Sequence, residues 1–282
     1  MKEEYYRQLY RQAVKELQEA LPDVAWPPSP PEEGIPAAVG QGLDLPGLID
    51  HTALKPDTTV PAVQRLCEEA VTFGFHSVCV SPCWVKLASR LLQGSGVKVC
   101  TVIGFPHGTT TTLAKVTEAV EAVACGAAEL DMVLNVGALK GRSLRRVWEE
   151  IARVREAAGE ERVLKVILET ALLEDVEKVL AALIAVKAGA DFVKTSTGFG
   201  GSGATAEDVS LLRRTVGSRA GVKASGGIRD LATALAMVRA GANRIGTSSG
   251  VQIARELAAR KGEKSLDETA AAEKRELCGD LQ

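Results

Sequence analysis

Four charged side chains lie inside sequence stretches that otherwise resemble buried strands. Asp131 lies in E-L-D-M-V-L-N-V, Lys165 in R-V-L-K-V-I-L-E-T, Lys194 in A-D-F-V-K-T-S and Lys223 in G-V-K-A-S. A charge inside an apolar strand costs free energy unless it is paired or used. One isolated lysine could extend its amine to water at a strand end. Three lysines and a carboxylate on successive strands favour a shared polar site.

The alternation of side chains along a strand places these charges on one face of each strand. Neighbouring residues point to opposite faces, so Lys194 lies opposite Val193 and Lys223 lies opposite Val222. Asp131 is separated in the same way from the apolar residues on either side of it. The pattern therefore predicts that the polar set shares one side of the sheet.

A pair of lysines on adjacent strands suggests attack by an amine on a carbonyl group. The amine must be neutral to attack, and the ordinary pKa of a lysine is about 10.4. Desolvation and a nearby positive charge both favour the neutral form. Either Lys194 or Lys223 could be the nucleophile on this argument, with the other lysine as its electrostatic neighbour. Asp131 could then move protons to and from the substrate.

Three glycine-rich segments predict a site for an anion. They are T-S-T-G-F-G-G-S-G-A-T (195–205), A-S-G-G-I-R (224–229) and I-G-T-S-S-G (245–250). Such loops expose backbone N–H groups, and the helices that follow add the positive ends of their dipoles. Ser248 and Ser249 add hydroxyl groups. A single loop of this kind could be only a tight turn, but three consecutive loops at one rim favour a phosphate site.

The elements that must position these residues form a repeated strand–helix pattern. Candidate strands cover residues 48–52, 77–81, 97–103, 129–136, 162–170, 190–196, 221–225 and 244–248. Each is followed by a stretch with helical periodicity, for example residues 61–72, 113–124, 144–157, 176–186, 207–216, 231–240 and 251–261, and Thr205 to Asp208 predicts an N-cap box. Eight such units predict an α/β protein of the (β/α)8 TIM barrel class. A doubly wound sheet would carry a glycine-rich turn after its first strand, and none is present.

The first forty residues differ from this pattern. Residues 3–20 predict an amphipathic helix, with Tyr6, Tyr10, Ala13 and Leu17 on one face, and the next segment holds six of the chain's eleven prolines. We therefore expect an N-terminal helix and Pro-rich extension over residues 1–40, the barrel over 41–262 and a tail over 263–282. Surface packing is the simpler interpretation of the extension, and contacts in a dimer or with a binding partner are the alternative.

Composition excludes several other classes of protein. Of 282 residues, 34 are Lys or Arg and 36 are Asp or Glu, so the net charge of -2 argues against nucleic-acid binding through bulk charge. No apolar run approaches the length of a membrane span, and the charged N-terminus does not resemble a secretory signal, which predicts a cytoplasmic protein. The six cysteines and three histidines form no metal-binding motif, so we expect no metal site, no disulfide framework and mostly buried thiols.

Four motifs in the same order resemble deoxyribose-phosphate aldolase. They are I-D-H-T-A-L-K-P (49–56), V-K-T-S-T-G-F (193–199), V-K-A-S-G-G-I-R (222–229) and G-T-S-S (246–249), within a resemblance that runs from about Leu45 to about Ala259. The resemblance implies a (β/α)8 barrel without a metal or organic cofactor. It also implies reversible cleavage of 2-deoxy-D-ribose 5-phosphate to D-glyceraldehyde 3-phosphate and acetaldehyde, in a homo-oligomer (dimer or tetramer).

The resemblance also assigns roles that the residues alone leave open. By it, Lys194 matches the Schiff-base lysine, Lys223 the lysine that lowers the pKa of Lys194, and Asp131 the proton donor and acceptor. Lys165 matches a lysine near the site, grouped with the substrate-binding residues and given a supporting electrostatic role. The phosphate-binding positions are matched by Gly198, Gly226, Gly227, Gly246, Ser248 and Ser249.

The resemblance does not cover the whole chain. The N-terminal helix and proline segment lie outside it, and no tyrosine follows Tyr10, although some family members use a C-terminal tyrosine in proton transfer. Another Schiff-base sugar-phosphate aldolase or a transaldolase is the alternative enzyme. A catalytically silent phosphate-binding barrel is the alternative outside enzymes, and it would be expected to lose Lys194, Lys223 or Asp131.

Overall fold

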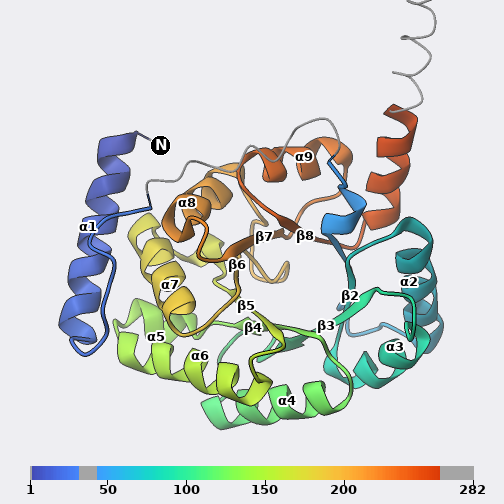
Figure 1. The fold of residues 1–282 in the computed structure, drawn as a ribbon, viewed down its shortest axis with the longest axis horizontal. Coiled ribbons are helices and arrows are strands. Elements are labelled where there is room, and N and C mark those ends of the chain that lie inside the picture. Colours follow the sequence, from blue (N-terminus) through green and yellow to red (C-terminus); the bar gives the residue numbers. More distant parts are fainter. Residues whose placement is uncertain (1, 32–42, 261–282) are drawn as a thin grey trace, which may run out of the picture.

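Eight parallel strands close into a barrel in the computed structural model, with helices packed around it (Figure 1). The structure describes residues 2–31 and 43–260. The strands pair in chain order, and the last pairs with the first. They are β1 (Ile49–Ala53), β2 (Ser77–Val80), β3 (Lys98–Ile103), β4 (Glu129–Val133), β5 (Val163–Ile167), β6 (Phe192–Lys194), β7 (Gly221–Ser225) and β8 (Arg244–Thr247). The predicted (β/α)8 barrel with an extra N-terminal helix is confirmed.

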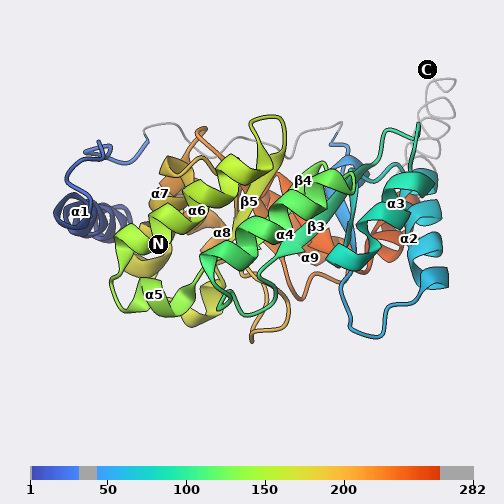
Figure 2. The ribbon, with the colours of Figure 1, turned by 90° about the horizontal axis from the view of Figure 1, so that it is seen from below.

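Helices connect the strands and cover the outside of the barrel (Figures 1 and 2). They are α1 (Glu3–Ala20), α2 (Val60–Phe73), α3 (Val85–Leu91), α4 (Thr112–Ala124), α5 (Val136–Lys140), α6 (Leu144–Ala158), α7 (Asp175–Lys187), α8 (Ala206–Val216) and α9 (Leu231–Arg239), and residues 250–260 are helical as well. Short 3-10 turns precede β1, α3 and α7, at Pro46–Leu48, Pro82–Trp84 and Thr170–Leu172. The proline-rich segment is described up to Pro31. The rest of that segment and the predicted tail over 263–282 lie outside the described residues.

Some local predictions need correction. The predicted fifth strand (162–170) ends at Ile167, before the 3-10 turn Thr170–Leu172. The fourth strand was expected to reach residue 136, but it ends at Val133 because the Asn135 side chain accepts a hydrogen bond from the backbone N–H of Ala138 and caps α5. Helices α3 and α5 are too short to show a clear helical period, so the sequence pattern does not reveal them. Thr205 caps α8 as expected, but the Asp208 carboxylate does not complete the box, because it pairs with Lys178 at 2.7 Å.

The N-terminal helix α1 packs against the barrel's outer layer. It lies beside α7 and α6 (Figures 1 and 2) and buries the face that its periodicity predicts, including Tyr6, Tyr10, Ala13 and Leu17. The Tyr6 hydroxyl donates a hydrogen bond to the carbonyl of Arg214 in α8 at 2.8 Å, and the Arg214 guanidinium lies 4.0 Å from the centre of the Tyr6 ring. The aromatic residues of α1 therefore extend the hydrophobic core outward.

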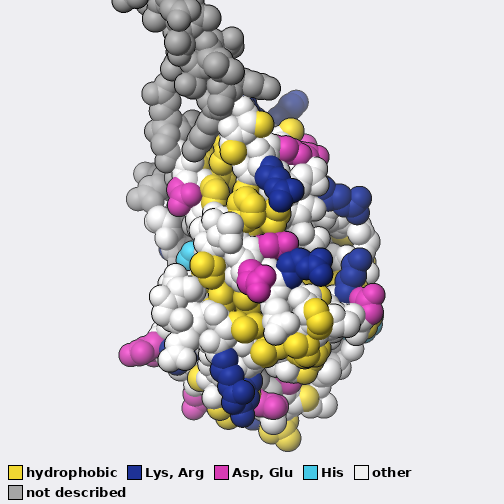
Figure 3. All heavy atoms as spheres, turned by 90° about the vertical axis from the view of Figure 1, so that its right-hand side faces the viewer, with side chains coloured by type: hydrophobic (Ala, Val, Ile, Leu, Met, Phe, Trp, Pro, Cys, Tyr) yellow, Lys and Arg dark blue, Asp and Glu magenta, His cyan; other side chains and the backbone are white. Residues whose placement is uncertain are grey.

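The cysteines differ in burial. Cys67, Cys79 and Cys100 are buried as expected, whereas Cys125 is partly buried, Cys83 is exposed and Cys278 lies outside the described residues. None of the helices within residues 2–31 and 43–260 has both the length and the apolar character that a membrane crossing requires. On the face over α2 and α3, hydrophobic side chains are scattered among charged ones (Figure 3).

Replacing Tyr10 tests how much α1 stabilises the barrel. Tyr10 is fully buried, whereas Tyr5 on the same helix is 49% exposed. We expect Tyr10→Ala to lower the free energy of unfolding by about 3 kcal/mol, because it removes a large buried ring. The control Tyr5→Ala should change it by less than about 0.5 kcal/mol. Urea unfolding followed by circular dichroism measures both, and equal small losses would contradict the role of α1 in the core.

Candidate active site

Three lysines converge on the single carboxylate of Asp131 inside the barrel. Asp131 Oδ2 accepts hydrogen bonds from Lys194 Nζ and Lys223 Nζ, each at 2.8 Å. Asp131 Oδ1 accepts from Lys165 Nζ at 3.0 Å and from Cys100 Sγ at 3.2 Å. Strand register produces this meeting, because Asp131 pairs with Lys165 across β4 and β5, and Lys194 pairs with Lys223 across β6 and β7. The structure thus brings together the four charges that the sequence singled out.

In this centre, ion pairing outweighs the effect of burial on the pKa of Asp131, Lys165 and Lys223. Burial alone would raise the pKa of Asp131, but the charges of Lys165, Lys194 and Lys223 outweigh it and hold that pKa well below its usual value. Burial alone would lower the pKa of Lys223, but Asp131 and Asp50 raise it above its ordinary value. The pKa of Lys165 is also raised, since Asp131 and other neighbours outweigh its burial. Asp131 is therefore a carboxylate, and Lys165 and Lys223 are ammonium ions at neutral pH.

A second group of charges, which the sequence analysis missed, lies next to this centre. Asp50 contacts Lys223 and accepts from Arg244 at 2.9 Å, and Glu129 contacts Lys165 and accepts from Arg244 at 3.0 Å. Asp50, Glu129 and Arg244 lie in the strands β1, β4 and β8 and are buried. The signal that identified Asp131, a charge inside a strand, applies to Asp50 as well, but Glu129 and Arg244 are the first residues of their strands and carry no such signal. We call the seven charged residues of both groups the barrel ion cluster: Asp50, Glu129, Asp131, Lys165, Lys194, Lys223 and Arg244.

A cavity of about 620 Å³ opens above the cluster, and we call it the mouth cavity. Lys194 is the member of the ion cluster that borders it. Its wall also contains most of the predicted phosphate-binding positions: Gly198, Gly226, Gly227, Gly246 and Ser248. Ser249 is not part of this wall, but its carbonyl accepts the first hydrogen bond of the helix over residues 250–260, from Ile253 at 3.1 Å. The N-terminus of that helix therefore opens beside Ser248.

Lys165 lies away from the mouth cavity. Its side chain is fully buried and touches Glu129 and Asp131, and it is not among the described residues that line the cavity. Lys223 and Asp131 are likewise fully buried below the wall. The geometry therefore gives Lys165 an electrostatic place behind Asp131 and not a direct contact with a ligand in the cavity.

Glycine is required at two positions of the wall for different reasons. Gly226 has φ +90°, which side chains rarely adopt, and a Cβ atom there would lie 2.9 Å from the Cα of Gly203. Gly246 has ordinary φ, but a Cβ atom would lie 3.0 Å from Cε of Lys223 and 2.9 Å from Cβ of Ser225. Gly226 therefore allows the close approach of two loops, and Gly246 leaves room for the Lys223 side chain.

Two cationic residues of the wall were not among the predicted site residues. Lys55 follows β1 and Arg229 follows β7, and both have exposed side chains bordering the mouth cavity. They belong to the motifs H-T-A-L-K-P and A-S-G-G-I-R, so their position in a motif was the available signal. Cations at the rim add to the attraction that the backbone N–H groups exert on an anion.

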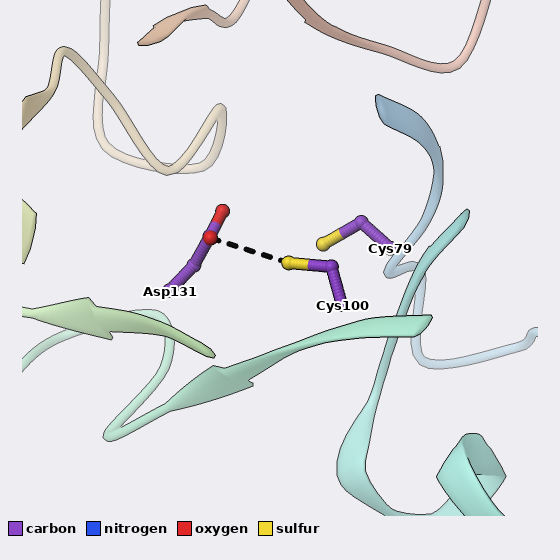
Figure 4. A group of neighbouring side chains, drawn as sticks. All are labelled: Cys79, Cys100 and Asp131. Carbon is purple, nitrogen blue, oxygen red and sulfur yellow. Dashed lines mark hydrogen bonds between the residues drawn. The ribbon is translucent and has the colours of Figure 1, made fainter. Parts of the chain in front are cut away.

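Within residues 2–31 and 43–260, two sets of side chains have spacing that could hold a metal ion: Cys79, Cys100 and Asp131, and Asp50, Cys100 and Glu129. Figure 4 shows the first set, in which Cys100 donates its thiol hydrogen to Asp131. Every carboxylate of the two sets already pairs with at least two cations of the ion cluster. A divalent ion would have to lie among these positive groups. The donor sets are therefore part of the ion cluster and fit a metal poorly.

The closed barrel and the lysine at the base of an anion-binding cavity define a class of protein, the (β/α)8 enzymes with a lysine amine at the barrel mouth. Residues 47–256 match the model of the DeoC/LacD family aldolases. The chain belongs to this family.

The relatives cover most of the barrel. The deoxyribose-phosphate aldolase of Brevibacillus brevis is 60% identical over 211 residues, which are 75% of this chain and 95% of that protein. The deoxyribose-phosphate aldolase of Methanothermobacter thermautotrophicus is 57% identical over 211 residues, 74% of this chain and 93% of that protein. The solved structure of the deoxyribose phosphate aldolase from Aeropyrum pernix, described as tetrameric, is 36% identical with a TM-score of 0.70 and covers 76% of this chain and 91% of its own.

Acid titration tests the ion cluster through Glu129. Burial raises the pKa of Glu129, but Lys165, the His76 hydrogen bond and Arg244 outweigh it and lower the pKa from 4.5 to about 2. A carboxyl with a depressed pKa stabilises the fold above its unfolded pKa, and the contribution is lost as the pH falls toward the folded pKa. We expect Glu129→Gln to be less stable than wild type by about 3 kcal/mol at neutral pH. The gap should narrow as the pH falls below about 4.5.

Urea unfolding of the two proteins between about pH 7 and about pH 3 measures this gap. The exposed Glu121 provides the matched control, and Glu121→Gln should follow the wild-type curve at every pH. A gap between wild type and Glu129→Gln that stays constant down to the lowest pH would contradict the depressed pKa of Glu129.

Proposed function

We propose that this chain reversibly cleaves 2-deoxy-D-ribose 5-phosphate to D-glyceraldehyde 3-phosphate and acetaldehyde, through a Schiff base on Lys194. Relatives named deoxyribose-phosphate aldolase that are 57% to 60% identical to it support the substrate. The observation that carries the chemistry is that Lys194 alone of the ion cluster borders the mouth cavity, while its amine contacts Asp131.

The ion cluster keeps Asp131 paired even without the charge of Lys194. The cluster contains three carboxylates (Asp50, Glu129 and Asp131) and four cationic groups (Lys165, Lys194, Lys223 and Arg244). Without Lys194, the three negative charges are matched by three positive charges. Lys223 and Lys165 therefore keep Asp131 paired while Lys194 Nζ forms a bond with the substrate.

The cleavage follows from these positions. Lys194 Nζ adds to C1 of the open-chain sugar, and loss of water leaves an iminium ion. Asp131, through water, takes the proton from the hydroxyl on C3. The bond between C2 and C3 then breaks, its electron pair moves toward nitrogen to form an enamine, and glyceraldehyde 3-phosphate leaves. Protonation of the enamine carbon and return of water release acetaldehyde and the free lysine.

The phosphate group would lie at the glycine-rich end of the mouth cavity. The backbone around Gly198, Gly226 and Gly227 and the hydroxyl of Ser248 offer hydrogen-bond donors there. Lys55 and Arg229 supply positive charge at the same cavity. These groups support a phosphorylated sugar as the substrate. The assignment of Gly246 and Ser249 to phosphate binding remains part of this proposal.

The alternative is another Schiff-base sugar-phosphate aldolase or a transaldolase. Such enzymes would use the same lysine and phosphate groups, but their donor substrates are larger than acetaldehyde. Formation of a covalent adduct from acetaldehyde alone separates them from the proposed activity.

We also propose that the chain is a cytoplasmic homo-oligomer, a dimer or a tetramer, in which the 41–262 barrel carries the activity and residues 1–40 are an accessory extension. The tetrameric relative from Aeropyrum pernix supports an oligomer. Val60, Val71 and Leu91, which are 43%, 48% and 42% exposed, offer apolar side chains on α2 and α3 for such contacts.

Borohydride trapping tests the proposed nucleophile. Incubation with acetaldehyde followed by reduction should add a two-carbon group to Lys194, and peptide mapping by mass spectrometry locates it. Lys194→Arg should form no adduct and lose turnover by at least about a thousandfold, because a guanidinium stays protonated. An adduct found mainly on Lys223 or Lys165 would overturn the assignment.

Arg229→Ala tests the phosphate end of the cavity. Loss of a hydrogen bond to a charged group should raise KM for 2-deoxyribose 5-phosphate about tenfold. Cleavage of unphosphorylated 2-deoxyribose should keep its kcat/KM. Arg239→Ala on α9 is the matched control, since Arg239 is exposed and does not border the cavity. A similar loss of kcat/KM with both sugars would show that Arg229 does not act on the phosphate.

A further inference from the structure

Glu169 adopts a backbone conformation that a residue with a side chain rarely takes. It follows β5 and has φ 56° and ψ 60°, in the left-handed region. Its side chain is buried, and the residue is 4% exposed. Strain of this kind persists only where the surrounding structure imposes it, and it is concentrated at functional sites.

The hydrogen bonds around Glu169 show how the chain accommodates it. Leu168 N–H donates to the carbonyl of Lys194, and Thr170 N–H donates to the carbonyl of Thr195. In a regular parallel ladder, donors two residues apart bond to acceptors two residues apart. The N–H of Thr170 would then bond to the carbonyl of the residue after Thr195. Glu169 is therefore the extra residue of a bulge, and bulges next to active sites redirect a side chain.

The redirected carboxylate binds Thr197 in the loop after β6. Thr197 Oγ1 donates to Glu169 Oε2 at 2.5 Å, and the backbone N–H of Thr197 lies 3.3 Å from the same oxygen. A Cβ atom at Gly200 would lie 2.9 Å from this carboxylate, so the loop passes closely over it. Thr197 also borders the mouth cavity, beside Lys194.

These contacts fix the hydrogen-bonding direction of the Thr197 hydroxyl. A hydroxyl has one hydrogen and two acceptor lone pairs, and an ionised carboxylate can only accept. The hydrogen of Thr197 points to Glu169, and one lone pair accepts from the backbone N–H of Phe199 at 3.1 Å. A ligand in the mouth cavity that reaches this hydroxyl can therefore only donate a hydrogen bond to it.

We infer that Glu169 is a positioning residue that holds Thr197 as a hydrogen-bond acceptor for the hydroxyl of the aldehyde acceptor. In the proposed reaction, on which this inference depends, that hydroxyl is the one on C2 of glyceraldehyde 3-phosphate. The hydroxyl on C3 of the intact sugar must give its proton to a base, so it is not the group that a pure acceptor would hold. The pair Glu169 and Thr197 therefore selects aldehydes that carry a hydroxyl next to the carbonyl.

The test compares two acceptors in the condensation with acetaldehyde: D-glyceraldehyde 3-phosphate and 3-oxopropyl phosphate, which lacks the hydroxyl. Wild type should have a higher kcat/KM for the hydroxylated aldehyde, because a site built for a hydroxyl rejects the analogue without it. Thr197→Val should lower that preference by about tenfold or more, mainly by loss of activity with D-glyceraldehyde 3-phosphate. Glu169→Gln should lower it in the same direction, because the amide can itself donate to Thr197 and no longer holds the Thr197 hydroxyl as a fixed acceptor.

Two further variants control for folding and for a general effect on the loop. Thr197→Ser keeps the hydroxyl and should keep the preference. Glu169→Asp keeps the charge but shortens the side chain, so it should also lower the preference. It takes the place of Glu169→Gln in the test if Glu169→Gln is not soluble. The double variant Glu169→Gln/Thr197→Val should show the same preference as Thr197→Val alone, since both substitutions act through one hydroxyl.

An unchanged ratio of kcat/KM for the two acceptors in Glu169→Gln would overturn the inference, because the loss of a purely structural residue would affect both acceptors equally. A further loss of preference in the Thr197→Val background would overturn it as well. Failure of the proposed function is separate, since wild type would then show no cleavage of 2-deoxyribose 5-phosphate and no acetaldehyde adduct.

Discussion

The carboxylate of Asp131 accepts hydrogen bonds from three lysines inside a closed barrel, and this shared contact governs the rest of the site. A buried charge is tolerated only when it is paired. Lys165 and Lys223 meet that condition for Asp131, and they are in turn paired by Glu129 and Asp50. The carboxylates and cations of the ion cluster are equal in number without Lys194. Lys194 is also the member of the cluster that borders the mouth cavity.

The ion cluster and the anion-binding loops lie at different depths in the barrel. Its interior holds the ion cluster on rigid strands, where register fixes each side chain opposite its partner. Its rim consists of loops in which glycines allow close backbone approach and leave N–H groups free for an anion. Glu169 and Thr197 connect the two levels, because a bulge at the end of β5 holds the loop that begins just after Lys194.

Helix α1 adds a further layer that lies outside the matched family region of residues 47–256. Helix α7 is buried over most of its surface, from Val179 to Ala185, because the barrel covers one side and α1 packs on the other. An apolar helix of this kind must be covered on both sides to remain in water.

Local sequence patterns were sufficient for the eight strands, for the buried face of α1 and for the inward direction of Asp131, Lys194 and Lys223, because alternation along one strand depends only on neighbouring residues. The residues taken without the family resemblance could not choose between Lys194 and Lys223. The sequence analysis also missed three buried charges (Asp50, Glu129 and Arg244), the rim cations Lys55 and Arg229, and the bulge at Glu169. These features depend on which strands lie side by side: Arg244 meets Asp50 across 194 residues of sequence. The closure of the barrel and the register of its strands decided which charges pair and which amine reaches the cavity, since burial makes pairing depend on three-dimensional contact and not on position along the chain.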